Sequence, residues 1–201
     1  MTSRADEAQR TGDRIVDAML QRFARLPFGQ IRLEDVAADA GVTVQTVIRR
    51  FGNKAGLLVA TVERELGRIA ASRSAIAGAS ARETVEALGD HYEFYGALIL
   101  KTYAEADLVD GMVELAKRGR EYHVSWCRSA FAVDSPPGAV GSAQRERRLA
   151  QIVAVCDART WSILRLESGL SAEQTTHALL EMLMPLIADE QAAVPTGPAP
   201  A

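Results

Sequence analysis

Residues 36–58 read VAADAGVTVQTVIRRFGNKAGLL, and this stretch predicts two short helices joined by a tight turn. The first helix places three small apolar residues on one face, Val36, Ala37 and Ala40. Gly41 permits the left-handed backbone that ends this helix, and Thr43 is a favourable N-cap for the next one. The second helix turns two apolar residues inward at i, i+4, Val47 and Phe51. This pattern is typical of a helix-turn-helix.

The outward face of the second helix is polar and consists of Gln45, Thr46, Arg49 and Arg50. The chain has no Asp or Glu between Asp39 and Glu63, although both arginines and Lys54 lie in that interval. Because a carboxylate repels phosphate, its absence across an exposed helix favours a DNA-facing surface. The alternative is an ordinary helical hairpin with a solvated basic face. The turn, the cap, the core spacing and the charge pattern coincide here, so DNA binding is the favoured interpretation.

Three motifs in this region resemble the N-terminal domain of the TetR/AcrR family of transcriptional regulators. They lie in order between Arg14 and Leu58 and read RIVDAMLQRFARLPFGQI, LEDVAADAGV and TVQTVIRRFGNKAGLL. Farther along the chain, RTWSILRLESGLSAEQT is similar to the paired C-terminal helices of one branch of that family.

The candidate DNA-binding residues are Arg32, Thr43, Val44, Gln45, Thr46, Arg49, Arg50 and Lys54, some of them matched to family positions and some chosen from their place on the exposed helix. Thr43 and Thr46 match positions whose hydroxyl groups bind phosphate. Lys54 matches a lysine at a helix N-terminus, where the helix dipole and the side-chain charge both attract phosphate. Three residues are expected to face the groove and read bases, Val44, Gln45 and Arg49. Gln can pair with adenine and Arg with guanine.

Three positions depart from the family pattern. Arg32 stands where family members often have a Ser or Thr cap, so the cap hydrogen bond is lost, although Arg can contact phosphate. Arg50 replaces a common His and supplies a permanent charge. Ile48 replaces a Tyr that binds phosphate, so it either reduces phosphate affinity or contacts a thymine methyl group.

The composition predicts an all-α fold, because Ala, Leu, Arg and Glu dominate and strand-like alternation is missing. We expect a three-helix helix-turn-helix DNA-binding domain in residues 1–58, with residues 1–10 as a flexible arm that can touch DNA. A helical effector-binding and dimerisation domain is expected in residues 59–193, and a Pro-rich, disordered tail in residues 194–201.

Periodicity predicts helices at residues 13–25, 54–72, 107–131, 143–167 and 172–192. Ser80 and Glu83 form a capping box that opens a further long helix, and Ser171 and Gln174 form a second box before the last helix. Three features interrupt the helical pattern, namely a loop at 72–80, a linker at 134–142 and Pro185, which is expected to kink the last helix.

The net charge of −3 is unevenly distributed along the chain. Residues 1–58 carry nine Lys and Arg against seven Asp and Glu, whereas residues 59–201 carry fourteen against nineteen. This asymmetry predicts a mildly basic reading domain on an acidic body. No apolar run reaches the length of a membrane span, and the N-terminus lacks a signal-peptide core, so a cytoplasmic protein without membrane contact is expected.

The sequence offers little support for catalysis. His123 and Cys127 share one helical face at i, i+4, but no third catalytic partner is visible. Cys127 and Cys156 do not form a disulfide framework, and the chain has only three histidines for a metal site. We therefore expect no catalytic residue, no metal and no cofactor.

Aromatic residues with polar groups predict a small-molecule effector pocket in the C-terminal body. The candidates are His91, Tyr92, Tyr95, Tyr103, Tyr122, His123, Trp126 and Trp161. An aromatic stripe at helical spacing is more often plain core, so the pocket is expected more firmly than any one of its members.

The resemblance implies that residues 143–167 and 171–192 pair with their copies in a second subunit. The candidate interface residues are Ile152, Val153, Cys156, Ile163, Leu179, Leu183 and Leu186. The alternative is that both helices only close the core of one chain. A two-fold dimer would let two reading domains bind a palindrome with half-sites about 34–36 Å apart, or a small multiple of that spacing.

Together these features predict a homodimeric, ligand-responsive regulator, in the first instance a repressor that binds a palindromic operator in double-stranded DNA. One alternative is an activator or nucleoid-type binder that uses the same reading domain. The other is a ligand-binding or scaffold dimer whose DNA reading has weakened, for which Ile48 and Arg32 are the warning signs.

Overall fold

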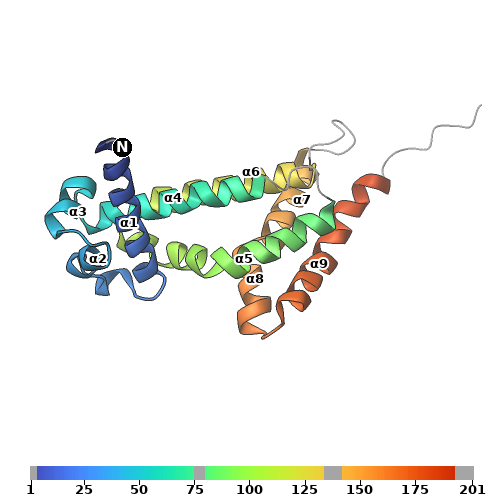
Figure 1. Ribbon diagram of the computed structural model, residues 1–201. Helices are drawn as coiled ribbons and strands as arrows, with labels where there is room; N and C mark the ends of the chain where they lie inside the picture. Colours follow the sequence, from blue (N-terminus) through green and yellow to red (C-terminus); the bar gives the residue numbers. More distant parts are fainter. Residues whose placement is uncertain (1–3, 75–79, 134–141, 193–201) are drawn as a thin grey trace, which may run out of the picture. The chain divides into compact units, whose positions relative to one another are not determined.

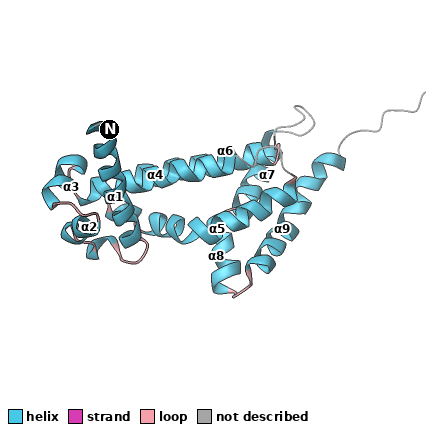
Figure 2. Ribbon diagram, viewed as in Figure 1, coloured by secondary structure: helices cyan, strands magenta, loops and turns pink. Residues whose placement is uncertain are grey.

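The computed structural model describes residues 4–74, 80–133 and 142–192, and every regular element in those ranges is helical (Figures 1 and 2). The predicted all-α fold is therefore confirmed. The elements are α1 (Arg4–Phe23), η1 (Phe28–Gln30), α2 (Leu33–Asp39), α3 (Val44–Phe51), α4 (Lys54–Ser74), α5 (Ala81–Ala104), η2 (Ala106–Leu108), α6 (Met112–Ala130), α7 (Ser142–Val155), α8 (Ala158–Ser162), the π-helical η3 (Ile163–Glu167) and α9 (Ala172–Ala192).

The chain forms two compact units. The first unit comprises residues 1–72 and 97–120, and the second comprises residues 73–96 and 121–201. The boundaries fall inside α4, α5 and α6, so each of these helices contributes to both units. The first unit is larger than the segment 1–58 assigned to DNA reading, and that functional boundary stays a prediction.

One apolar core holds the first unit together. The stripe on α1 is fully buried at Ile15, Met19 and Phe23, as its helical spacing predicts. The same core takes in residues of α2, α3 and α4, together with five residues of η2 and α6 that follow much later in the sequence: Ala106, Val109, Met112, Leu115 and Ala116. Helices α2 and α3 therefore pack on a core that residues 1–58 do not complete by themselves.

Helix α1 begins earlier than the sequence analysis predicts. Residues 4–10, expected as a flexible arm, form its first turns, while residues 1–3 lie outside the described ranges. Two causes extend the helix. Asp6 and Glu7 lie in its first turn, where negative charge interacts favourably with the helix dipole, and Arg50 Nη1 donates a hydrogen bond to the carbonyl oxygen of Ala8 at 2.9 Å.

Both predicted capping boxes are present. Ser80 Oγ accepts from the backbone N–H of Glu83 at 3.3 Å, and the Glu83 carboxylate accepts from the backbone N–H of Ser80 at 2.8 Å. The Ser80 hydroxyl also donates to this carboxylate at 2.7 Å, and this bond, together with the one from the Ser80 backbone N–H, lowers the pKa of Glu83. Ser171 and Gln174 exchange the equivalent pair at 2.9 and 3.1 Å. Pro185 lies inside α9 as the sequence indicates.

Two predicted helices are divided in the structure. The segment 107–131 begins with the 3-10 turn η2, and Gly111 at φ 83° separates this turn from α6. The segment 143–167 splits into α7, α8 and η3, because the Asp157 side chain accepts from the backbone N–H of Arg159 at 2.8 Å and so starts a new helix. The predicted linker at 134–142 lies almost wholly outside the described residues, and so do residues 75–79 of the predicted loop.

Candidate functional site

The turn between α2 and α3 adopts the geometry that a helix-turn-helix requires. Gly41 has φ 66°, a left-handed conformation in which a side chain would be strained. Thr43 caps α3, because its Oγ1 accepts from the backbone N–H of Thr46 at 3.2 Å. Val47 is fully buried and anchors α3 on the core. The turn at Gly41, the cap at Thr43 and the buried side chain of Val47 together fix which face of α3 is exposed.

The exposed face of α3 carries Gln45, Arg49 and Arg50, as predicted. Ile48 is also exposed, with 44% of its surface accessible. Two of the predicted DNA-binding residues are held more closely by the protein. Val44 is half-buried and packs against the core, and the Thr46 hydroxyl lies 3.0 Å from that of Thr43. Gln45 and Arg49 are therefore more exposed than Val44.

Arg49 and Arg50 differ in what their guanidinium groups contact. No hydrogen bond or ion pair joins Arg49 to any other residue in the described ranges. Arg50 binds the Ala8 carbonyl and lies so close to Gly12 that a Cβ on that glycine would be 2.3 Å from Nη2. Gly12 thus makes room for Arg50 against α1, a role that the sequence pattern alone did not reveal.

The ammonium group of Lys54 also contacts the protein. It donates to the carbonyl oxygens of Phe28 and Ile31, each at 2.9 Å, and lies 4.3 Å from the centroid of the Phe28 ring. Lys54 therefore ties the first turn of α4 to the segment that connects α1 to α2. Two of its three N–H groups are used in this way, which leaves one for a phosphate.

The two carboxylates nearest to α3 in sequence both form ion pairs with Arg22. Arg22 Nε donates to Asp39 at 2.6 Å, and Arg22 Nη1 lies 3.4 Å from Asp35. The hydrogen bond from Arg22 lowers the pKa of Asp39. Arg32 is exposed, provides no cap for α2 and lies 3.7 Å from Glu34. The exposed face of α3 consequently presents positive charge without an unpaired acidic group beside it.

A glycine turn, a capped second helix and an exposed basic face define a helix-turn-helix DNA-binding protein. Residues 15–61 match the family described as "Bacterial regulatory proteins, tetR family". This match covers the same N-terminal segment as the three sequence motifs, so the predicted resemblance of that segment to the TetR family of transcriptional regulators is confirmed. The matched family is described as one of regulatory proteins, which agrees with the prediction that the chain is not an enzyme.

Solved structures share the fold along most of the chain. A transcriptional regulator from Rhodococcus sp. Rha1 is similar with a TM-score of 0.70 at 15% identity, covering 89% of this chain and 96% of that one. A putative TetR-family regulator from Mesorhizobium loti has a TM-score of 0.68 at 14% identity, covering 94% and 98%. FadR from Bacillus subtilis, solved in complex with stearoyl-CoA, has a TM-score of 0.64 at 15% identity, covering 85% and 96%. No curated protein matches the chain by sequence.

The predicted pocket residues do not all line one cavity. In the second unit, His91, Tyr92, His123, Trp126 and Trp161 are buried. Their rings are in contact. The ring centroids of His91 and Tyr92 are 5.4 Å apart, those of Tyr92 and Trp161 5.9 Å, and those of His123 and Trp126 6.3 Å.

The three other predicted pocket residues lie in different surroundings. Tyr95 is half-buried, and its ring lies 5.1 Å from that of His91. Tyr103 belongs to the first unit, where it lines a small cavity of about 50 Å³ between α4, α5 and α6. Tyr122 is half-buried on α6.

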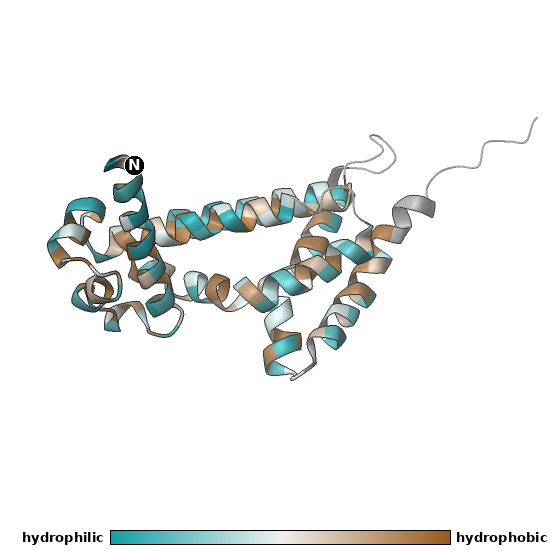
Figure 3. Cartoon of the chain, in the orientation of Figure 1, coloured by the Kyte–Doolittle hydropathy of each residue, from teal (hydrophilic) through white to brown (hydrophobic). Residues whose placement is uncertain are grey.

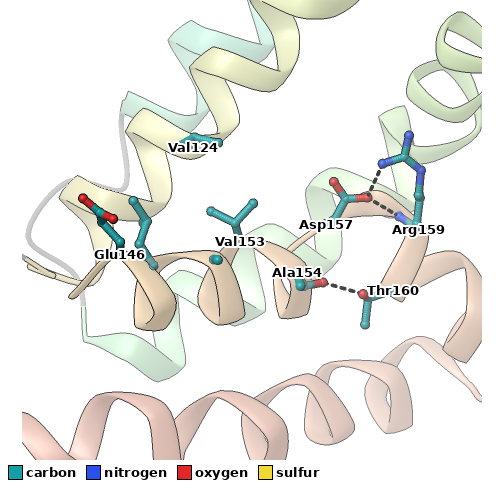
Figure 4. A pocket seen from close by; sticks show the side chains of 9 residues that line it. Val124, Glu146, Val153, Ala154, Asp157, Arg159 and Thr160 are labelled. Atoms are coloured by element: carbon teal, nitrogen blue, oxygen red, sulfur yellow. Dashed lines mark hydrogen bonds and ion pairs between the residues drawn. The ribbon is translucent and has the colours of Figure 1, made fainter. Parts of the chain in front are cut away.

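An open groove on the second unit was not foreseen from the sequence. Its volume is about 550 Å³, and it is lined by Val124, Glu146, Leu149, Ala150, Val153, Ala154, Asp157, Arg159 and Thr160 (Figure 4). Figure 4 shows Val124 on α6 opposite the side chains of α7, with the ion pair of Asp157 and Arg159 at one end. Apolar spacing along α7 is the signal that could have indicated it.

The predicted dimer residues lie mostly inside the second unit. Four of them are buried there, namely Ile152, Cys156, Leu179 and Leu183. Val153 and Leu186 are half-buried, and Ile163 alone of the seven is exposed, at 52%. Hydrophobic residues recur along both α7 and α9 in Figure 3, and the inward ones pack these helices together within one chain. The buried four therefore have little surface to offer a second subunit.

His123 and Cys127 approach each other as their spacing predicts, with Cys127 Sγ 3.7 Å from His123 Nε2. A hydrogen bond with Cys156 and burial both raise the pKa of Cys127, so the thiol stays protonated. Within the described ranges, no three His, Cys, Asp or Glu residues are placed to hold a metal ion. A search of the same residues finds no helix that is both long and apolar enough to span a membrane.

Proposed function

We propose that this TetR-family DNA-binding regulator is a ligand-responsive repressor that binds a palindromic operator as a homodimer. The observation that carries the proposal is the exposed face of α3. Val47 fixes that helix on the core, while Gln45 and Arg49 extend outward with the Arg49 guanidinium unpaired in the described structure. Gln and Arg are the side chains that pair with adenine and guanine in the major groove.

The roles of the cations follow from their contacts. Arg49 is the residue for base readout, because its guanidinium has no competing partner in the described ranges. Arg50 and Lys54 fasten the reading domain through backbone carbonyls, and their remaining N–H groups can meet phosphate. Thr43 both stabilises the reading domain and can meet phosphate, since its hydroxyl caps α3 at the end that faces the DNA backbone in this class of protein.

Dimerisation is supported by exposed apolar residues on η3 and α9. These two elements contact each other within the second unit. Ile163 and Leu166 on η3 expose 52% and 57% of their surface, and Met182 on α9 exposes 45%. These three residues, rather than the buried residues of α7 and α9, form the surface that we assign to the second subunit. Apolar residues exposed in this way suit a two-fold interface in which the same surface of each chain meets its copy.

The effector is a small amphipathic molecule that binds in the second unit. The buried aromatic cluster provides apolar walls with polar groups, and FadR from Bacillus subtilis, which shares the fold, was solved with stearoyl-CoA. A ligand that binds one arrangement of the dimer more tightly shifts the population toward it, and release from DNA follows if that arrangement fits the operator poorly.

One alternative retains specific support. Ile48 is 44% exposed where the family usually has a phosphate-binding Tyr, and Arg32 provides no cap for α2. Both features fit a ligand-binding or scaffold dimer whose DNA reading has weakened. An activator that uses the same reading domain differs only in the sign of regulation, which a transcript measurement with and without the gene decides.

Selection of bound duplexes from a random library tests the proposal, at near-physiological salt because affinity depends on it. An enriched palindrome is expected for the natural chain, and loss of enrichment for a Gln45→Ala, Arg49→Ala double variant with an unchanged melting temperature. No enrichment by the natural chain, shown to be folded, supports the weakened-reading alternative.

The dimer surface has its own test. Ile163→Glu combined with Leu166→Glu is expected to give a monomer in sedimentation measurements, because charge replaces apolar surface in the proposed interface. Leu108→Glu combined with Val113→Glu introduces the same two charges at exposed apolar residues of the other unit, where Leu108 is 69% and Val113 51% exposed, and should leave the dimer intact. If the two variants have the same oligomeric state in sedimentation measurements, the interface does not lie at Ile163 and Leu166.

A further inference from the structure

A buried arginine lies among the aromatic residues of the second unit. Arg73, in the last turn of α4, exposes only 4% of its surface. Its Nη2 donates to Tyr92 Oη at 3.2 Å, and its Nη1 lies 3.1 Å from His123 Nδ1. The guanidinium also lies 4.9 Å from the Trp126 ring centroid and 5.6 Å from that of Tyr92.

Among the described residues, this arginine has no anionic partner. In the part of the chain that the structure describes, no carboxylate lies within ion-pair distance of Arg73, and its Nε has no hydrogen-bond partner. Burying a charge without a counter-charge is costly, and contacts with aromatic faces offset only part of that cost. An anionic ligand would supply what the protein leaves out.

The neighbouring groups cannot supply the negative charge themselves. Tyr92 is a donor, because its hydroxyl binds the Cys156 carbonyl oxygen at 2.6 Å, and burial raises its pKa further from neutrality. Asp157, the acidic residue that acts on Tyr92 electrostatically, caps α8 and lies 3.8 Å from Arg159. The thiol of Cys127 is held protonated as described above.

A second nitrogen in the cluster is also unpartnered. His91 Nε2 is buried without a hydrogen bond, and its ring contacts those of Tyr92 and Tyr95. Burial and, secondarily, the charge of Arg73 lower the pKa of His91 to about 3, so the ring is neutral and can donate one N–H. In the described chain neither Arg73 Nε nor His91 Nε2 has a partner, and in the tautomer with its proton on Nε2 the histidine adds a second unsatisfied donor.

The cluster adjoins the open groove of Figure 4. His123 Nε2 lies 3.3 Å from the carbonyl oxygen of Val153, which lines the groove, while Nδ1 faces Arg73. This arrangement fits the neutral tautomer with its proton on Nε2. Among the described residues, the His123 ring links Arg73 to the groove wall by its two ring nitrogens, so we expect a ligand in the groove to reach the guanidinium by displacing that ring.

We propose that Arg73 and His91 form the anion-binding end of the effector site, and that the effector is a monocarboxylic acid with an apolar body. The proposal rests on the ligand-responsive function proposed above. A planar guanidinium pairs with a carboxylate through two parallel hydrogen bonds. One permanent cation balances one negative charge, which selects a free carboxylic acid over a phosphate-rich thioester of coenzyme A. Trp126 and Trp161 provide the apolar walls.

Intrinsic fluorescence gives a direct readout, because both tryptophans of the chain belong to this cluster. The probes are decanoate, decanol and decanoyl-CoA, titrated into the full-length protein. Decanoate is expected to change the emission and to bind at least about tenfold more tightly than either other probe, the factor expected from one charge-assisted hydrogen bond.

Arg73→Met tests the assigned residue, and Arg147→Met removes the same charge from an exposed position in the same unit. Arg73→Met should lose at least about tenfold in decanoate affinity and nothing for decanol, while Arg147→Met should match the natural chain. Arg73→Met should also fold, because an apolar side chain of similar length replaces an unpaired buried charge. Arg73→Lys, which keeps the charge, should retain part of the affinity and provides the comparison if the Met variant unfolds.

Equal affinity for decanoate and decanol, or no response to any probe, would overturn the proposal. Its failure is distinct from failure of the proposed function. If decanoate binds in an Arg73-dependent manner but does not release selected DNA, the anion site stands and ligand-responsive repression is wrong. If DNA is selected as a palindrome but no carboxylate binds, the reading domain stands and the anion site is wrong.

Discussion

Lys54 offers the sharpest test of how the reading domain is held together. Its ammonium group donates to the carbonyl oxygens of Phe28 and Ile31, both at 2.9 Å. Lys54→Met keeps the apolar stem and removes both hydrogen bonds. A hydrogen bond to a charged group contributes about 1.5–3 kcal/mol, and partial exposure places these two near the lower end, so a loss of about 3 kcal/mol is expected.

That loss should be visible in thermal unfolding. For a chain of this size, about 1 kcal/mol corresponds to about 2–4 °C, so Lys54→Met should melt roughly 6–12 °C lower. Arg118→Met is the control, because it removes an exposed ion pair with Glu63 in the same unit, with both side chains about half exposed. Such pairs contribute about 0–1 kcal/mol, so its melting temperature should hardly change.

The salt dependence of DNA binding separates the two roles of Lys54. If the ammonium group mainly binds carbonyls, the slope of log affinity against log salt should be unchanged in Lys54→Met, measured where the variant is folded. The reasoning is refuted by an unchanged melting temperature together with a slope that falls by about 0.9, the value expected for one lost phosphate contact. Lys54 would then serve DNA rather than the fold.

Three further predictions use other contacts. Arg49→Ala should cost about 1–3 kcal/mol on the selected operator and relax preference at one base pair, and equal losses on specific and random DNA would contradict base readout. Gly96→Ala should destabilise the second unit by about 1–3 kcal/mol in denaturant unfolding, because the added Cβ would lie 2.5 Å from the Trp161 ring, and an unchanged midpoint would refute that clash. Since burial lowers the pKa of His91 to about 3, the folded chain stays neutral there while the unfolded chain takes up a proton below about pH 6.5. As the pH is lowered from about 6.5 to about 3, the natural chain should therefore lose up to about 1.4 kcal/mol of stability per pH unit more than His91→Gln does. Equal slopes for the two proteins would show that His91 titrates normally.

Much of the fold was predictable because its signals are local. The capping boxes at Ser80 and Ser171 depend on residues three positions apart, and both form as predicted. Gly41 and Thr43 likewise set the turn and the start of α3 through adjacent backbone geometry. The division at Asp157 was missed, because an Asp within an apolar helical pattern can either remain on the helix surface or start a new helix.

The sequence by itself determined the helix-turn-helix, the all-α class and the polar face of α3, because helical periodicity, caps and glycine conformations act within a few residues. Only the tertiary structure decided what each cation contacts. Arg50 meets a carbonyl 42 positions away, Lys54 meets carbonyls 26 and 23 positions away, and Arg73 reaches His123 across 50 positions. Long side chains take whichever acceptor the folded chain brings near, so their partners depend on packing between distant segments. The same packing buried four of the residues that were expected at a dimer interface, and among the described residues it left Arg73 without a counter-charge.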